Sequence, residues 1–342
     1  MEDIPLRHSQ QIILTSEDAI PLYREEQSRF AGALAPDGET CAAWVEQLDP
    51  LPVGLALDCP PVAEEGERPR TVHYISLCKE AFRKQLHEAA AFYYLRGAET
   101  FFALRAAVLA LGDLSGRTVI AELNVHDDEA RLEDGTELVA AVGVLQRIGV
   151  STVVLTAPDP DSLTEALDRV APYARLSVGV AIHSAWLRAD TTLYNTELYL
   201  PVDHDDERQL LDALKAHRGG RTVARDHDDF ILAPDGNNAH FIAPTVDISD
   251  EIECGHRLGE SLLDAEEETG ALKLVLETEE DVVALEECRY LISRPVCLCA
   301  ESPELLEQGL RVFPGLALYD GTWEQEEEML HYWEQKYGLI RL

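Results

Sequence analysis

Short apolar runs alternate with longer amphipathic runs along this chain, a pattern typical of strands and helices that build a parallel sheet. The alternation is clearest in the middle third, where apolar runs predict strands at 117–125, 151–156 and 175–183. Between these strands, apolar residues at helical spacing predict helices over 134–149 and 162–173. Strands and helices alternating in this way indicate either a doubly wound sheet or a (β/α)8 barrel.

The first third of the chain follows the same pattern less regularly. Apolar runs predict strands at 11–14, 53–58 and 72–77. Helices are predicted after the last of these strands, at about 79–95 and 100–111.

The pattern loosens after residue 197 and becomes regular again near residue 246. One helix and a hairpin that turns at 235–238 are predicted in this stretch, and 247–255 is predicted to be an exposed linker. Strand and helix then alternate to the end of the sequence. We therefore predict two α/β domains, over 1–245 and 246–342.

The charge balance excludes several classes of partner. The 342 residues include 28 Lys and Arg against 64 Asp and Glu, a formal net charge of −36. A nucleic-acid-binding protein needs clustered positive charge to displace phosphate counterions, and an anionic membrane surface repels an acidic protein. Nucleic acid and membranes are therefore not expected partners, whereas a small-molecule ligand or a basic protein partner is compatible with this charge.

The cysteines and the apolar runs indicate a cytoplasmic protein. The seven cysteines are an odd number at irregular spacing, which favours reduced thiols over a disulfide framework. No apolar run approaches the ~20 residues that span a bilayer, and the polar start lacks the apolar core of a signal peptide.

Sequence motifs for cofactors and metals are weak. Neither glycine-rich nucleotide fingerprint is present, so a dinucleotide enzyme is not expected. His and acidic residues form HDDE at 126–129 and 204–207 and DHDD at 226–229, but acidic turns are common in so acidic a chain. Cys297 and Cys299 share one face of a predicted strand, where core packing is the more common role. We predict no metal site and no cofactor.

The barrel interpretation points to four candidate binding residues. Functional side chains of (β/α)8 barrels lie at the carboxyl ends of the strands. In this sequence those positions are Glu122 and Asn124, Thr156, and His183. Glu122 stands in an otherwise apolar strand, where a buried carboxylate needs a partner, although strand alternation can also turn it to solvent.

The middle third also resembles a known family. The stretch 119–187, with its acidic turn DGTEL, the helix end RIG and the helix end APY, is similar to the homocysteine S-methyltransferase module of cobalamin-dependent methionine synthase. The stretch 294–321 resembles a shortened piece of the pterin-binding region that follows in that enzyme. The resemblance implies a methyltransferase-like TIM barrel over 1–245, incomplete or distorted, and a truncated pterin-binding-like domain over 246–342.

Members of that family hold zinc with three cysteine thiolates, which activate a substrate thiol for methyl transfer. At the position that the resemblance gives to the first zinc ligand this chain has Ala157, and the pair of adjacent cysteines that supplies the other two has no counterpart. Whether the chain is an enzyme is therefore open, and the catalytic residues are unknown.

Three functions remain. The first is a pseudoenzyme, a methyltransferase-like protein that serves as a binding or assembly subunit in methionine or one-carbon metabolism. The second is an active enzyme with a relocated site at the carboxyl rim of the barrel, formed by the four candidate residues, with an HDDE motif supplying a metal other than the family's zinc. The third is the family activity itself, preserved through an unrelated thiolate site built from Cys297 and Cys299 with Cys254 or Cys288.

Overall fold

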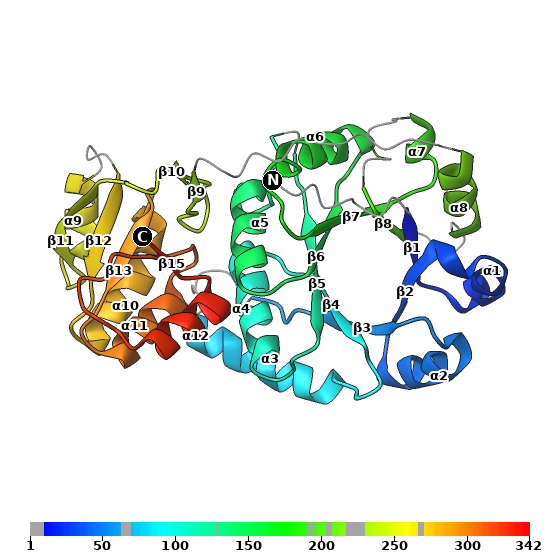
Figure 1. Ribbon diagram of the computed structural model, residues 1–342, viewed down its shortest axis with the longest axis horizontal. Coiled ribbons are helices and arrows are strands. Elements are labelled where there is room, and N and C mark those ends of the chain that lie inside the picture. The colour runs from blue at the N-terminus through cyan, green and yellow to red at the C-terminus, as the bar shows by residue number, and fades with distance from the viewer. Residues whose placement is uncertain are drawn as a thin grey trace.

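In a computed structural model, eight parallel strands form a closed barrel surrounded by helices (Figure 1). The structure describes residues 10–62, 70–127, 129–189, 193, 196–202, 207–216, 230–265 and 270–342. The barrel strands are β1 Gln11–Leu14, β2 Phe30–Ala35, β3 Val53–Asp58, β4 Phe92–Arg96, β5 Thr118–Asn124, β6 Thr152–Thr156, β7 Ser177–Ile182 and β8 Leu198–Pro201. The helices around them are α1 Ile20–Glu25, α2 Gly38–Leu48, α3 Thr71–Gln85, α4 Phe101–Gly112, α5 Leu138–Arg147, α6 Pro160–Val170, α7 Trp186–Ala189 and α8 Glu207–Ala216.

The predicted (β/α)8 architecture is confirmed, and the barrel is complete. Each strand pairs in parallel with the next, and β8 returns to β1 through the pairs Gln11–Leu198 and Ile12–Tyr199. The expected incompleteness is therefore wrong. The eighth strand, Leu198–Pro201, lies directly before the acidic stretch at which the periodic pattern loosens, and strands this short give a weak sequence signal.

In the first third, α1, β2 and α2 were not predicted, and one predicted strand and one predicted helix are wrong. Residues 72–77 are helical, because the buried residues of α3 recur at helical spacing over a longer window, as Tyr74, Cys78 and Phe82 show. The predicted helix 79–95 ends at Gln85 instead, and the aromatic run Phe92–Arg96 forms β4. Aromatic residues favour strands, and this preference was the missed signal.

The inner face of the barrel is packed around Phe92. The apolar side chains inside are Ile13, Leu34, Ala56, Phe92, Tyr94, Ile120, Val154, Ala181 and Leu200. The Phe92 ring occupies space that neighbouring glycines leave open: an ideal Cβ on Gly54 would lie 2.1 Å from the ring, and one on Gly32 would lie 3.2 Å from it. Glycine at these two positions thus permits a large aromatic side chain in the floor of the barrel.

After the barrel come a short hairpin and a second parallel sheet. The hairpin strands are β9 Ile231–Leu232 and β10 Phe241–Ile242, as the sequence predicts. The sheet has the order β11 Ile248–Glu253, β12 Ala271–Val275, β13 Val296–Cys299, β14 Leu318–Tyr319 and β15 Ile340–Arg341. Its connecting helices are α9 Leu258–Asp264, α10 Glu279–Cys288, α11 Pro303–Val312 and α12 Glu327–Tyr337.

The segment 247–255 contains strand β11, so its prediction as a linker is wrong. β11 is an edge strand with exposed acidic residues such as Asp250 and Glu251, and this polarity hides a strand from a hydrophobicity pattern. α11 packs against α3, and α12 packs against α4 and α5, so the helices of the second sheet face the barrel (Figure 1).

A buried arginine joins the two parts of the molecule. Arg105 of α4 is 3% exposed, and its two terminal nitrogens each donate a 2.9 Å hydrogen bond, to the carbonyl oxygens of Leu310 and Arg311. These carbonyls belong to the last turn of α11, where the helix dipole favours a positive charge. Burial lowers the pKa of Arg105 to about 10, so the side chain stays charged at neutral pH.

In the described ranges, no helix combines the length and the apolar character that crossing a membrane requires.

We expect Arg105→Lys to lower the free energy of unfolding by about 1–3 kcal/mol, because a lysine cannot donate to both carbonyls in the fixed geometry of a guanidinium group. Urea unfolding measures this change. Arg83→Lys, on an exposed position of α3, is the matched control and should stay within about 0.5 kcal/mol of the wild type. Equal stability of the two variants would contradict this role of Arg105.

We expect Gly54→Ala to destabilise the barrel by about 1–3 kcal/mol, because the added methyl group would overlap the Phe92 ring. Combining it with Phe92→Leu should recover part of this loss, since the smaller side chain vacates the same space. Gly112→Ala is the control, because a Cβ there meets nothing within 4 Å. Thermal unfolding of the four variants tests the coupling, and strictly additive effects would exclude it.

Candidate functional site

A cavity of about 410 Å³ opens at the carboxyl ends of the barrel strands. This end of a (β/α)8 barrel carries the functional side chains, and the volume is within the range of small-molecule pockets. Its polar lining comes from four strands or the residues directly after them, and the rest is apolar. The lining residues are Thr15, Leu34, Pro36, Ala56, Tyr94, Arg96, Glu122, Thr156, Ala181, Leu200, Pro201 and Val202.

A tyrosine–carboxyl pair lies at the bottom of this cavity, which we call the mouth cavity. The Tyr94 hydroxyl donates a 2.7 Å hydrogen bond to Oε2 of Glu122 on the neighbouring strand. Tyr94 is 2% exposed and Glu122 is half-buried. Burial raises the pKa of Glu122, although the Tyr94 hydrogen bond and the charge of Arg96 oppose this effect. Burial, followed by the negative charge of Glu122, raises the pKa of Tyr94 well above its ordinary value.

Arg96 supplies a positive charge to the lining of the mouth cavity. It lies two residues after Tyr94, on the same face of the strand. Its Nε donates a 2.7 Å hydrogen bond to Oδ1 of Asp58, which lies directly opposite on β3. Of the three guanidinium nitrogens of Arg96, Nε alone has a hydrogen-bond partner among the described residues, so both terminal nitrogens remain available to an anionic group. The cavity thus presents a carboxyl group and a guanidinium group together.

Of the four residues predicted from the sequence, three lie together. Glu122 and Thr156 both line the mouth cavity, and the Thr156 hydroxyl donates a hydrogen bond to Oδ1 of Asn124. His183 follows the end of β7, and its ring packs against Trp186 with 5.3 Å between the ring centroids. The structure therefore joins Glu122, Asn124 and Thr156 and places His183 against the start of α7.

The sequence prediction missed Tyr94, Arg96 and Asp58. The predicted helix 79–95 included Tyr94 and ended just before Arg96, so the strand face that these two residues share was not recognised. Asp58 ends the correctly predicted strand 53–58, and the barrel rule that selected Glu122 would have selected it too.

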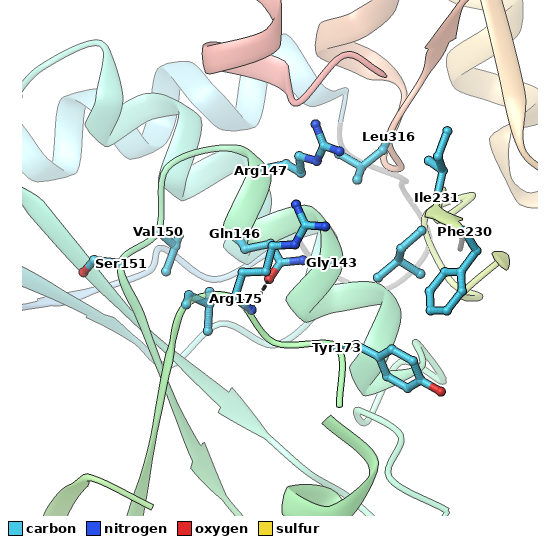
Figure 2. Close-up of a pocket in the computed structure, with 12 residues that line it drawn as sticks. Gly143, Gln146, Arg147, Val150, Ser151, Tyr173, Arg175, Phe230, Ile231 and Leu316 are labelled. Carbon is cyan, nitrogen blue, oxygen red and sulfur yellow. Dashed lines mark hydrogen bonds between the residues drawn. The ribbon is translucent and has the colours of Figure 1, made fainter. Parts of the chain in front are cut away.

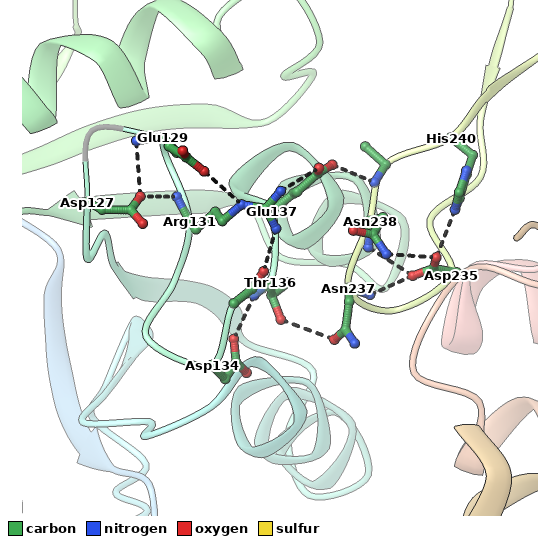
Figure 3. Close-up of polar contacts among 12 residues, drawn as sticks. Asp127, Glu129, Arg131, Asp134, Thr136, Glu137, Asp235, Asn237, Asn238 and His240 are labelled. Atoms are coloured by element: carbon green, nitrogen blue, oxygen red, sulfur yellow. Dashed lines mark hydrogen bonds and ion pairs between the residues drawn. The ribbon is translucent and has the colours of Figure 1, made fainter. Parts of the chain in front are cut away.

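The acidic loop 126–129 serves as a turn within the described residues. Oδ1 of Asp127 accepts hydrogen bonds from the backbone nitrogens of Glu129 and Arg131, at 3.1 and 3.2 Å. Figure 3 shows that Arg131 then pairs with Glu137, whose other oxygen accepts a 2.9 Å bond from the Ala239 nitrogen. The carboxylates thereby tie the β5–α5 loop to the hairpin.

The other two acidic motifs are only partly described. In 204–207, Glu207 is 3% exposed and accepts a 3.1 Å hydrogen bond from the Thr15 hydroxyl at the end of β1. Residues 204–206 and 226–229 lie outside the described residues.

The thiols of the chain do not fit the zinc site that the family resemblance implies. The sequence has no cysteine between Cys78 and Cys254, so strands β4 to β8 carry none. Cys59, directly after β3, is buried, and burial raises the pKa of its thiol and raises that of Cys78 to about 12. A three-thiolate site at the carboxyl ends of these strands cannot form from this set.

A second cavity, of about 450 Å³, lies at the amino ends of β6 and β7 (Figure 2). Arg147 of α5 and Arg175 border it, together with Tyr173 and Phe230. Both arginines are exposed, so water and salt weaken their attraction for an anion. Residues at the amino-terminal end of a (β/α)8 barrel usually contribute to stability, whereas the functional residues lie at the carboxyl end. We therefore place the candidate functional site at the mouth cavity.

Comparisons with known proteins show a similarity of fold. No protein-family model and no curated protein matches the sequence. The chain is similar to crystal structures of the homocysteine methyltransferase MmuM from Escherichia coli, in the apo form (13% identity, TM-score 0.47) and the oxidised form (12%, 0.45). Each likeness covers 61% of this chain and 96% of the other.

The carboxyl transferase domain of Rhizobium etli pyruvate carboxylase is also similar, with 9% identity and a TM-score of 0.39 over 57% of this chain and 40% of the other. At identities and TM-scores this low, the similarity carries no argument about chemistry, which depends on the residues of the mouth cavity.

Proposed function

We propose that this protein is a homocysteine-methyltransferase-like barrel that binds a small amino-acid-like molecule in the mouth cavity without zinc-dependent methyl transfer. The observation that carries the proposal is the presence of Glu122 and Arg96 in one cavity of amino-acid size. A carboxylate complements the ammonium group of an amino acid, and a guanidinium group complements its carboxylate. Leu34, Ala181 and Leu200 provide apolar surface for the side chain of the ligand.

The missing thiolates support the second part of the proposal. Zinc-dependent activation of a substrate thiol needs a bound ion, and strands β4 to β8 offer it no cysteine. A barrel that binds its ligand without transforming it would serve as a binding or assembly subunit in methionine or one-carbon metabolism.

The active enzyme with a relocated site is the second candidate. Tyr94 and Glu122, 2.7 Å apart, could exchange a proton with a ligand, and a carboxyl group whose pKa is raised by burial suits general acid–base catalysis. Conversion of homocysteine or methionine by the purified protein would favour this candidate over simple binding.

We expect isothermal titration calorimetry to show binding of L-homocysteine or L-methionine to chelator-treated protein. Glu122→Gln should weaken this binding at least tenfold, because it removes the charge that meets the ammonium group, and Glu39→Gln on exposed α2 should not. Val202→Trp should block the cavity entrance, whereas Val45→Trp, at another exposed valine, should leave binding unchanged.

Absence of heat with both amino acids, or equal affinity in Glu122→Gln and the wild type, would overturn the proposed ligand. Zinc-dependent methylation of homocysteine by the protein would overturn the proposed lack of catalysis.

The affinity should also depend on pH. The pKa of Glu122 lies above its ordinary value of 4.5, so lowering the pH protonates Glu122 before an ordinary glutamate. Protonation removes the partner of the ammonium group, and the carboxylate of the ligand stays ionised down to a pH of about 3.5. Affinity should therefore fall as the pH decreases toward 4.5, and this fall should be absent in Glu122→Gln. The same titration measured at a series of pH values tests this, and an identical pH profile in both proteins would contradict it.

A further inference from the structure

Two cysteines and an aspartate meet on one face of the C-terminal sheet. Leu298 of β13 lies under Gly309 of α11, so it faces the helices. Cys297 and Cys299, on either side of Leu298, point to the opposite face, because side chains alternate along a strand. Asp320 directly follows β14, the next strand, so the three side chains gather toward the carboxyl edge of the sheet.

The three potential ligand atoms are close together. The sulfur atoms of Cys297 and Cys299 are 3.9 Å apart, and the Cys299 sulfur is 3.7 Å from Oδ1 of Asp320. All three ligand atoms lie within 4.8 Å of one another. Both cysteines are buried, at 0% and 2% exposure, and the Asp320 side chain is 16% exposed.

We propose that Cys297, Cys299 and Asp320 bind one divalent zinc ion. Two sulfur ligands at about 2.3 Å from a tetrahedral zinc ion are about 3.8 Å apart, and a sulfur and a carboxylate oxygen are about 3.6 Å apart. The observed separations of 3.9 Å between the sulfur atoms and 3.7 Å between the Cys299 sulfur and the carboxylate oxygen match these two values. Thiolate and carboxylate ligands in tetrahedral geometry favour zinc over magnesium or calcium.

The surroundings of the three ligands suit such an ion. Two thiolates, one carboxylate and Zn²⁺ carry a net charge of −1, which Lys273 offsets with its ammonium group 3.1 Å from Oδ2 of Asp320. Thr322 accepts a 2.6 Å hydrogen bond from Lys273 and donates one of 2.8 Å to Asp320, so the loop after β14 orients the carboxylate. Such partners of a ligand increase metal affinity.

When the zinc ion binds, it replaces the protons of the two thiols, and no group is oxidised or reduced. Each of the two thiols loses its proton to solvent as its sulfur binds the ion, and the carboxylate binds in its ionised form. Three protein ligands leave the fourth tetrahedral position for a water molecule, as in catalytic rather than closed structural zinc sites. This set differs from the one predicted with Cys254 or Cys288, since Asp320 takes their place.

A disulfide between Cys297 and Cys299 is less favourable than zinc binding by the two thiolates. Cysteines two apart on a strand have Cα atoms about 6.6 Å apart, at the upper end of the distance that a disulfide accepts.

The test is zinc content and Co²⁺ spectroscopy of the full-length protein, reduced, stripped with a chelator and reloaded. We expect one zinc per chain. With Co²⁺ in place of zinc, we expect a thiolate-to-cobalt charge-transfer band whose absorbance corresponds to two thiolate ligands. Cys297→Ser/Cys299→Ser should abolish both signals, and Asp320→Asn should weaken zinc binding at least tenfold. Cys254→Ser, at another fully buried thiol of this part of the chain, should retain one zinc.

Substoichiometric zinc in the wild type, a cobalt spectrum without the charge-transfer band, or zinc retained by the double serine variant would overturn the site. So would a disulfide between Cys297 and Cys299 that persists under reducing conditions. If the double variant fails to fold, the wild-type cobalt spectrum and the Asp320→Asn affinity decide the question. Amino-acid binding to the barrel is measured separately, so either proposal can fail alone.

Discussion

The arrangement of the barrel interior depends on how Phe92 packs. Its ring fills the floor of the barrel in the space left by Gly32 and Gly54. Because side chains alternate along β4, placing Phe92 inward also places Tyr94 and Arg96 inward, at two successive levels nearer the mouth. Tyr94 then reaches Glu122, and Arg96 lies at the cavity entrance. One strand therefore connects the packed floor of the barrel to the charged groups of its mouth.

The few positive charges of this acidic chain have specific partners at important positions. Arg105 holds the last turn of α11 against the barrel, Arg96 faces the mouth cavity beside Asp58, and Lys273 neutralises the carboxylate of the C-terminal cluster. A net charge of −36 creates a negative potential, and this potential favours the charged form of a buried or half-buried arginine or lysine. The overall acidity does not determine which cations are used locally.

Both proposed sites lie where parallel strands end. The carboxyl ends of the barrel strands form the mouth cavity, and the carboxyl edge of the second sheet brings Cys299 next to Asp320. Parallel sheets gather the residues that follow several strands at one edge, whatever the sequence distance between them. The zinc-binding chemistry that the family resemblance places in the barrel is thus proposed for the other sheet, with a different set of ligands.

Local spacing in the sequence determined much of the fold. The strands β5, β6 and β7 and the helices between them follow from apolar periodicity, because one buried face is sufficient to define each element. Glu122, Asn124 and Thr156 were found because a polar residue at the end of such a strand is conspicuous. Strand β4 and edge strand β11 were missed, since an aromatic run beside a helix and a polar edge strand both lack clear periodicity.

Only the tertiary structure decided which polar groups meet. The pairing of β3, β4 and β5 brings together Asp58, Arg96 and Glu122, and the pairing of β13 with β14 brings Asp320 to the cysteines. The sequence by itself determined the type and order of most elements, because these depend on neighbouring residues. The composition of each site depends on strand pairing between distant segments, and contacts that no local pattern contains set that pairing.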